Sequence, residues 1–273
     1  MKKLPTNILR KWTLLLALAI GFSLTASAQE ASTASLYNKA LASLKGKDYE
    51  AGYPQMEEAL KAAEADGNEK IIGLAKKNGA KAAYNLGAMK RKAKAYDEAL
   101  TLYNRGIELN PEYSANYMGI AQAMEGKGEK VEAVKGYLTA ADFYMKKDKA
   151  DRAKQLVKKA TSIVGKLYSG KDYATAVTAG KAHLEMKETQ SAHYYVAKSM
   201  EKQKDNKNAV AHINKAVEMA AASGKAVPDK YYWAQGNILE ATGDKSGAAA
   251  AYKKITGEKY KANADFRIKE IEG

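Results

Sequence analysis

Residues Ala83 to Pro111 form the clearest repeat unit of the sequence and read AYNLGAMKRKAKAYDEALTLYNRGIELNP. The stretch from Tyr117 to Ala141 reads YMGIAQAMEGKGEKVEAVKGYLTAA, and a shift of 34 residues aligns the two. The shift pairs small residues with small residues and one tyrosine with another: Gly87 with Ala121, Ala99 with Ala133 and Tyr103 with Tyr137. Self-similarity at such a period predicts a repeat protein in which each unit is two packed helices.

The small residues in this pattern have a steric role. Gly87 on the first helix lets the second helix approach closely, and Ala99 on the second helix lets the next unit pack against it. Larger side chains such as Leu86 and Tyr103 fill the space between the helices. Pro111 follows the second helix, and because proline lacks a backbone N–H it marks the end of that helix.

The two units resemble the tetratricopeptide repeat family, whose period is 34 residues. The resemblance is carried by YNLG at 84–87, YDEA at 96–99 and the terminal Pro111. It implies an all-α fold, a right-handed superhelix (α-solenoid) of about six helical hairpins with a C-terminal capping helix. A Sel1-like or other helical-hairpin solenoid is the alternative.

The same template recurs less closely along the rest of the chain. The first helix of each of the six units has a small residue at the matching position, and Val164 fits this pattern worst. These residues are Ala40, Gly87, Ala121, Val164, Ala197 and Gly236. The further predicted turns are Lys47–Tyr49, Gly170–Tyr173, Lys204–Asp205 and Gly243–Asp244. In such turns a glycine can adopt a left-handed conformation and an acid can cap the next helix. Wider spacings predict extra helix or loop within residues 64–81, 147–159 and 221–228, and residues 263–272 predict a capping helix.

The N-terminus has the form of a secretory signal peptide. It contains four basic residues, an apolar run from Trp12 to Leu24, and a small-x-small cleavage site at Ala26-Ser27-Ala28. We therefore expect residues 1–28 to be cleaved, leaving 29–273 as a single tetratricopeptide-like domain with no integral membrane segment. An uncleaved anchor helix is the alternative. The predicted location is the periplasm or cell surface of a Gram-negative bacterium.

The chain is strongly basic, with a formal net charge of +14. Removal of the four basic residues in 1–28 leaves +10, which favours an acidic protein face, anionic polysaccharide or phospholipid headgroups as partners. A solvated lysine-rich surface would explain the same charge. An exported protein is not expected to bind nucleic acid. The sequence has no cysteine, which excludes disulfides, thiol catalysis and cysteine-bound zinc.

Signals of catalysis are weak throughout the sequence. The three histidines, His183, His193 and His212, lack the i, i+3 or i, i+4 spacing of a helical metal site. Residues 165–172 (GKLYSGKD) approach a phosphate-binding loop, but Asp172 replaces the required Ser or Thr, so a helix end and turn is the better interpretation. We therefore predict no enzymatic activity, no metal and no cofactor. A hydrolase with two converging carboxylates remains a third hypothesis.

The resemblance implies that side chains of the first helices line a concave groove for a peptide or a partner helix. Three positions before each small residue lie Tyr37, Tyr84, Met118, Thr161, Tyr194 and Trp233. The predicted groove residues are Tyr37, Tyr84, Arg91, Lys92, Met118, Gln122, Tyr194, Lys198, Trp233 and Asn237. Tyrosine, tryptophan and arginine dominate many interfaces. The alternative is that these aromatic rings pack against the next repeat.

The sequence thus predicts a non-enzymatic scaffold or adaptor that holds a protein or peptide segment, favouring an acidic one, in its groove. The alternative function is binding of anionic envelope carbohydrate or lipid through the basic surface. Chaperone-binding members of the resembled family hold a C-terminal carboxylate with Lys and Asn side chains, and this sequence matches that clamp only in part. Asn38 with Lys45 and Asn85 with Lys92 fit it, but tyrosines stand where the clamp needs its first lysine.

Overall fold

The computed structural model describes residues 33–273, and that range contains helices, turns and loops but no strand. The chain forms two compact units that divide between Asn116 and Tyr117. The predicted signal peptide, residues 1–28, lies outside the described residues. Within the described range, no helix combines the length and the apolar character needed to cross a membrane.

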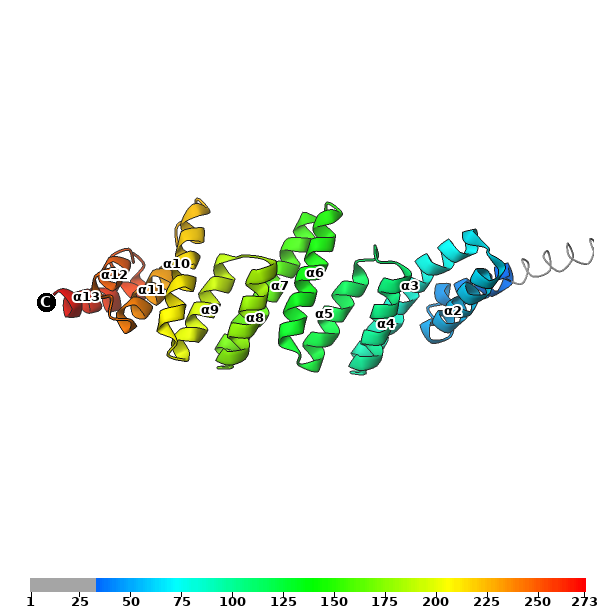
Figure 1. Ribbon diagram of the computed structural model, residues 1–273, viewed down its shortest axis with the longest axis horizontal. Coiled ribbons are helices and arrows are strands. Elements are labelled where there is room, and N and C mark those ends of the chain that lie inside the picture. Colours follow the sequence, from blue (N-terminus) through cyan, green and yellow to red (C-terminus); the bar gives the residue numbers. More distant parts are fainter. Residues whose placement is uncertain (1–32) are drawn as a thin grey trace, which may run out of the picture. The chain divides into compact units, whose positions relative to one another are not determined.

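The helices of the first unit follow one another through short turns (Figure 1). They are a helix over residues 33–45, α2 (Tyr49–Asp66), α3 (Glu69–Lys92) and α4 (Tyr96–Leu109). The next helix, α5 (Ala115–Lys127), contains the unit boundary. The second unit continues with α6 (Lys130–Lys146), α7 (Ala150–Ser169), α8 (Tyr173–Met186), α9 (Gln190–Lys202), α10 (Asn206–Ala222), α11 (Asp229–Ala241), α12 (Lys245–Tyr252) and α13 (Glu258–Glu272).

The described helices pair as helical hairpins, as the sequence predicted. Turns of two or three residues join the helix at 33–45 to α2, α3 to α4, α5 to α6, α7 to α8, α9 to α10, and α11 to α12. This gives six hairpins within residues 33–252, followed by α13. The all-α prediction and the number of hairpins are therefore confirmed for the described residues.

Every one of these six turns contains a residue with positive φ. Glycine fills the position in two turns, at Gly243, where a predicted turn lies, and at Gly128. In the predicted turn that begins at Gly170, the glycine has a φ of −78° and the next residue takes the left-handed conformation instead. In the other four turns the residue is a lysine with φ between 63° and 65°: Lys47, Lys94, Lys171 and Lys204. Because a Cβ makes the left-handed conformation unfavourable, each of these lysines costs stability that a glycine would not.

Acidic residues cap the second helix in three of the hairpins. The side chains of Asp48, Asp172 and Asp244 accept hydrogen bonds from backbone N–H groups in the first turns of α2, α8 and α12. A carboxylate there satisfies a free helical N–H and opposes the positive end of the helix dipole. The predicted combination of a sharp turn and an acidic cap is present in these hairpins.

Small residues sit where a tyrosine of the partner helix needs room. A Cβ added to Gly87 of α3 would lie 2.7 Å from the Tyr103 ring of α4. A Cβ added to Gly236 of α11 would lie only 2.2 Å from the Tyr252 ring of α12. Tyr103 and Tyr252 are fully buried. The glycine–tyrosine pairing inferred from the repeat is therefore a real packing contact.

The wide spacings between repeats are mostly filled by longer helices. The segment 64–81 contributes to α3, which is 24 residues long, after a turn at Gly67. The segment 147–159 begins α7, which has 20 residues. Residues 223–228 form the predicted loop. The terminal helix α13 starts at Glu258, five residues before the predicted start at 263.

Candidate binding groove

Helix α7 has two faces of different chemistry. Its buried face carries aliphatic side chains, including Leu156, Ile163 and Val164, which pack into the core of the second unit. Lys154 and Lys158 are exposed and one helical turn apart. Residues four apart lie on one face of a helix, so these two lysines point to the same side.

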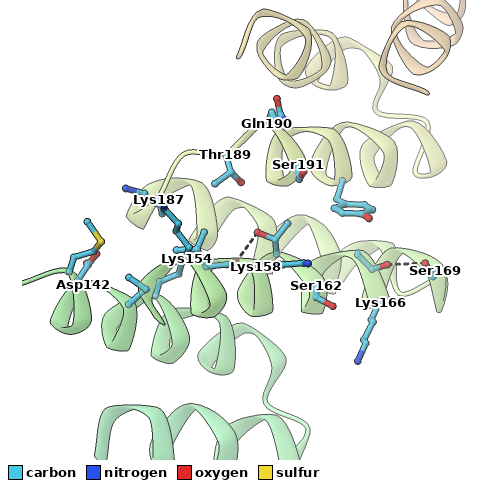
Figure 2. A pocket seen from close by; sticks show the side chains of 18 residues that line it. Asp142, Lys154, Lys158, Ser162, Lys166, Ser169, Lys187, Thr189, Gln190 and Ser191 are labelled. Carbon is cyan, nitrogen blue, oxygen red and sulfur yellow. Dashed lines mark hydrogen bonds between the residues drawn. The ribbon is translucent and has the colours of Figure 1, made fainter. Parts of the chain in front are cut away.

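This lysine face borders a groove in the second unit that has a volume of about 860 Å³. We call it the α6–α7–α9 groove. Its lining comes from α6 (Leu138, Ala141, Asp142, Met145), from α7 (Ala153, Lys154, Val157, Lys158, Thr161, Ser162, Gly165, Lys166, Ser169), and from the α8–α9 connection and α9 (Lys187, Thr189, Gln190, Ser191, Tyr195). Figure 2 shows Thr189, Gln190 and Ser191 across the groove from the α7 side chains.

The groove is positively charged, because four lysines and one aspartate line it. Lys154 lies 4.0 Å from Asp151, but both side chains are so exposed that the pair is weak. Among the described residues, Lys158, Lys166 and Lys187 have no carboxylate within ion-pair distance. In Figure 2 the Lys166 side chain points away from the α9 side of the groove. Lys154, Lys158 and Lys187 are thus the cations available to an anionic occupant.

The floor of the groove is aliphatic. Leu138 and Ala141 are buried where α6 packs on α7, and Val157 of α7 is half-buried beside them. Met145 at the end of α6 lines the groove and is 52% exposed, so its apolar side chain is accessible there. An occupant with an apolar side chain would cover this surface.

His183 fixes one wall of the groove to the other. This fully buried histidine of α8 has its Nε2 2.9 Å from Thr161 Oγ1 of α7 and its Nδ1 2.8 Å from the carbonyl oxygen of Lys187. A carbonyl can only accept, so in the neutral ring Nδ1 carries the proton and donates it to the Lys187 oxygen. Burial lowers the pKa of His183 below its ordinary value, which favours this neutral form.

A second series of hydrogen bonds, through His193 and His212, supports the α8–α9 connection. Glu188 Oε1 lies 3.0 Å from His193 Nε2, and His193 Nδ1 lies 3.0 Å from His212 Nδ1 on α10. The hydrogen bond from His193 lowers the pKa of Glu188, while burial lowers the pKa of His212. The residues on either side of Glu188, Lys187 and Thr189, line the groove. The three histidines therefore position a groove wall.

The structure divides the predicted groove residues between its two compact units. In the first unit Tyr37 is buried, and its hydroxyl accepts a 2.7 Å hydrogen bond from Asn78 Nδ2. The ring centre of Tyr84 lies 6.0 Å from those of Tyr103 and Tyr113. Arg91 is half-buried and Lys92 is exposed in the last turn of α3.

In the second unit the predicted aromatic residues also have partners within the protein. Tyr194 stacks on Tyr231 with ring centres 4.8 Å apart, and burial raises its pKa. Trp233 lies 5.3 Å from the ring of Tyr252, whose hydroxyl donates to Asn237 Oδ1 at 2.8 Å. The remaining predicted residues are Met118, half-buried near Arg152, Gln122, half-buried on α5, and Lys198, buried against Glu201. Each aromatic residue has a packing role, and a continuous binding column stays a prediction.

Carboxylates outside the groove pair with basic residues. Glu57 pairs with Arg105 through two contacts of 2.8 and 3.2 Å, and Glu270 and Glu272 pair with Arg267 and Lys253. Residues 165–169 end α7 and residues 170–172 form the turn, as predicted. No group of three or more His, Asp or Glu side chains within residues 33–273 is placed to hold a metal ion.

The sequence pattern does not predict the α6–α7–α9 groove, because this groove surrounds the weakest repeat. Thr161 stands in the column three positions before the small residues, but it lacks the large side chain of the other members. The usable signal was the i, i+4 spacing of Lys154 and Lys158 opposite an aliphatic face. The sequence could not show that Lys187, distant along the chain, faces the same space.

Comparison with known proteins supports the repeat assignment. Residues 80–113 match the family described as "Tetratricopeptide repeat". These residues cover the second helical hairpin from the middle of α3 through α4. No curated protein matches the sequence significantly.

Solved structures share the helical architecture at low identity. The TPR2AB domain of yeast Sti1, in a complex with pHSP90, is 14% identical over 88% of this chain and 100% of that one, with a TM-score of 0.37. A tetratricopeptide repeat protein of Parabacteroides merdae is 17% identical over 89% and 99%, with a TM-score of 0.34. PilF of Pseudomonas aeruginosa is 12% identical over 90% and 98%, with a TM-score of 0.35.

The repeat assignment rests on the match at residues 80–113 and on the six helical hairpins within residues 33–252. On these two observations residues 80–113 form a tetratricopeptide repeat, and the helices on either side of it continue the array of helical hairpins.

Proposed function

We propose that this protein is a non-enzymatic scaffold that holds a segment of a partner protein in the α6–α7–α9 groove. Tetratricopeptide repeats mediate protein–protein interaction. The observation that supports this site is a groove of about 860 Å³ that combines an aliphatic floor with unpaired lysines. An apolar floor provides contact area, and a few polar groups at its edge provide specificity.

Photocrosslinking from inside the groove tests this function. A photoreactive amino acid at Ser162, which lines the groove, should form crosslinks to one or a few proteins in cells that express the full chain. The same amino acid at Lys207, exposed on α10 outside the groove, is the matched control. Equal crosslinking from the two positions would argue against the groove as the binding site.

We propose further that the scaffold works outside the cytoplasm, in the periplasm or on the cell surface of a Gram-negative bacterium. The support is the basic and apolar pattern of residues 1–28 with its small-x-small site. Fractionation of cells that express the full chain should find a mature protein that begins at Gln29. Retention of the intact chain in the cytoplasm would contradict this proposal.

A second candidate function is the binding of anionic envelope carbohydrate or lipid. It is favoured by the unpaired lysines of the groove and by the formal charge of +14. Such binding should weaken steeply with added salt, since screening shortens the reach of exposed charges. Cosedimentation with phosphatidylglycerol vesicles at low and high salt measures it, and binding that does not depend on salt would count against it.

A further inference from the structure

We propose that the turn between α6 and α7 docks onto the surface of an anionic phospholipid bilayer. The docking surface consists of this turn and the residues next to it, 145–154, which we call the α6–α7 tip. This inference rests on the second candidate function. It commits that function to a phospholipid bilayer and to one part of the chain.

Positive charge is concentrated at the α6–α7 tip and the helix that follows it. Residues 145–159 read MKKDKADRAKQLVKK, with seven basic and two acidic residues, so the net charge of this segment is +5. That is half of the +10 that remains when residues 1–28 are removed. Clusters of basic residues bind anionic lipid headgroups, and each lysine or arginine near the bilayer raises the affinity about fivefold.

The cations of the tip are available to an external anion. Lys146 and Lys149 are exposed, and neither has a carboxylate within ion-pair distance among residues 33–273. Lys146 lies 5.6 Å from the ring centre of Phe143, and Arg152 lies 5.6 Å from that of Tyr144. Such contacts orient a cation without neutralising its charge. A lipid phosphate would therefore meet these side chains without displacing an internal ion pair.

The stability of α7 does not account for this charge. Lys149 is the N-cap residue of α7, and it makes no side-chain capping hydrogen bond. The start of a helix favours an acidic residue, as Asp48, Asp172 and Asp244 show at α2, α8 and α12. A lysine at this position is repelled by the positive end of the helix dipole, so its charge needs another explanation.

The tip projects from the second unit and carries an apolar side chain. Helices α6 and α7 have 17 and 20 residues, whereas α8 and α9 have 14 and 13. Figure 1 shows the α6–α7 turn reaching beyond the α8–α9 connection on the same side of the unit. Met145, in the last turn of α6, is 52% exposed. An apolar side chain among cations can enter the headgroup region while the lysines stay at the phosphates.

The order of the cations along α7 predicts contact through its end. Lys149 and Lys158 are nine residues apart, which is about 13.5 Å along the helix axis. The potential of a lipid surface falls off within a Debye length, about 8 Å at physiological ionic strength. A bilayer at the tip therefore attracts Lys149 and leaves Lys158 nearly unaffected. A flexible anionic glycan could run along α7 and meet both lysines, so these two residues distinguish the two occupants.

Cosedimentation of the mature protein with vesicles tests the proposal at physiological ionic strength. We expect binding to vesicles of phosphatidylglycerol and phosphatidylcholine and little binding to phosphatidylcholine alone. Lys149→Glu should weaken binding about fivefold or more, whereas Lys158→Glu, the same charge change on the same helix, should stay within about twofold. Lys146→Glu/Lys149→Glu should weaken binding about 25-fold or more. Lys207→Glu/Lys245→Glu, at exposed positions of α10 and α12, should stay within about twofold.

A fluorescent dye locates the contact independently of charge. Because the sequence has no cysteine, Met145→Cys provides a single attachment site for an environment-sensitive dye. Its emission should shift to the blue when the phosphatidylglycerol vesicles are added. The same dye at Lys207→Cys, exposed on α10, is the matched control and should show no shift. Circular dichroism checks that each variant folds.

Several results would overturn the proposal. They are equal binding to both kinds of vesicle, an equal loss of affinity in Lys149→Glu and Lys158→Glu, or an equal blue shift at both dye positions. Binding of heparin by the tip, with none of the vesicles, would assign this surface to a glycan instead.

The outcomes also separate this inference from the functions on which it rests. If the vesicles bind and Lys146→Glu/Lys149→Glu keeps full affinity, the second candidate function stands and the tip is the wrong surface. If the parent protein binds no anionic vesicle, the lipid function fails together with this inference. The scaffold function is tested separately by crosslinking from Ser162, since neither Lys146 nor Lys149 lines the α6–α7–α9 groove.

Discussion

The contact between Gly236 and Tyr252 allows a sharp test of the packing argument. In Gly236→Ala the new Cβ would lie 2.2 Å from one ring carbon of Tyr252 and 2.6 Å from two others. Carbon atoms in contact are normally about 3.5–4.0 Å apart. The ring cannot easily retreat, because it is fully buried and its hydroxyl donates to Asn237 and Glu240 at 2.8 and 3.0 Å. The substitution must therefore distort the α11–α12 hairpin.

Two opposing effects set the change in the free energy of unfolding that Gly236→Ala causes. Overpacking a core costs about 1–3 kcal/mol. Replacing glycine by alanine inside a helix stabilises by about 1 kcal/mol. We expect a net loss of about 1–2 kcal/mol in the free energy of unfolding, because an overlap with a held ring belongs at the upper end of the packing range.

Urea unfolding followed by circular dichroism measures the change. The matched control is Gly73→Ala on α3, where an added Cβ meets no atom within 4 Å. That variant should be more stable than the parent by about 0.5–1 kcal/mol. Adding Tyr252→Leu to Gly236→Ala should recover part of the loss as a coupling energy. If Gly236→Ala is as stable as Gly73→Ala, the steric account of the repeat is refuted.

The other predictions concern the histidines and one ion pair. His183→Leu should lower the free energy of unfolding by about 1–3 kcal/mol, because the Lys187 carbonyl loses its buried donor, and urea unfolding measures this. The pKa values of His183 and His212 are lowered by burial, so the unfolded chain takes up protons first as the pH falls. Stability should then be complete above the ordinary histidine pKa of about 6.5 and fall as the pH drops below it, and a His183→Leu/His212→Gln variant should show a flatter pH profile. Arg105→Ala should cost about 1 kcal/mol, because it leaves the half-buried Glu57 without its bidentate partner, and high salt should reduce this difference.

The hairpins could be predicted because their signals are local. A small residue such as Gly87, an aromatic residue such as Tyr103 and an acid such as Asp172 have fixed roles within one unit. Steric room and helix capping depend on neighbours within about 20 residues, which a repeat pattern reveals. The positions of the turns were predicted correctly for the same reason, including the turn of the weak fourth unit at residues 170–172.

The groove could not be predicted because its walls come from distant parts of the chain. Lys158 and Lys187 line one groove only because α7 and the α8–α9 connection pack together through His183. The histidines carried no spacing signal, so their positioning role was also hidden. The aromatic residues gave a signal, but a pattern of tyrosines cannot separate a ring that packs, as Tyr194 does on Tyr231, from one that binds.

The four lysines with positive φ in the hairpin turns have a consequence for engineering this chain. Glycine at Lys47, Lys94, Lys171 and Lys204 would relieve about 1–2 kcal/mol of conformational strain at each turn, less about 0.5–1 kcal/mol for the added freedom of the unfolded chain. Because the turns belong to separate hairpins, the gains should add. The natural turns thus leave a reserve of thermal stability unused, and a redesign that recovered it would exchange four positive charges for a more heat-resistant array.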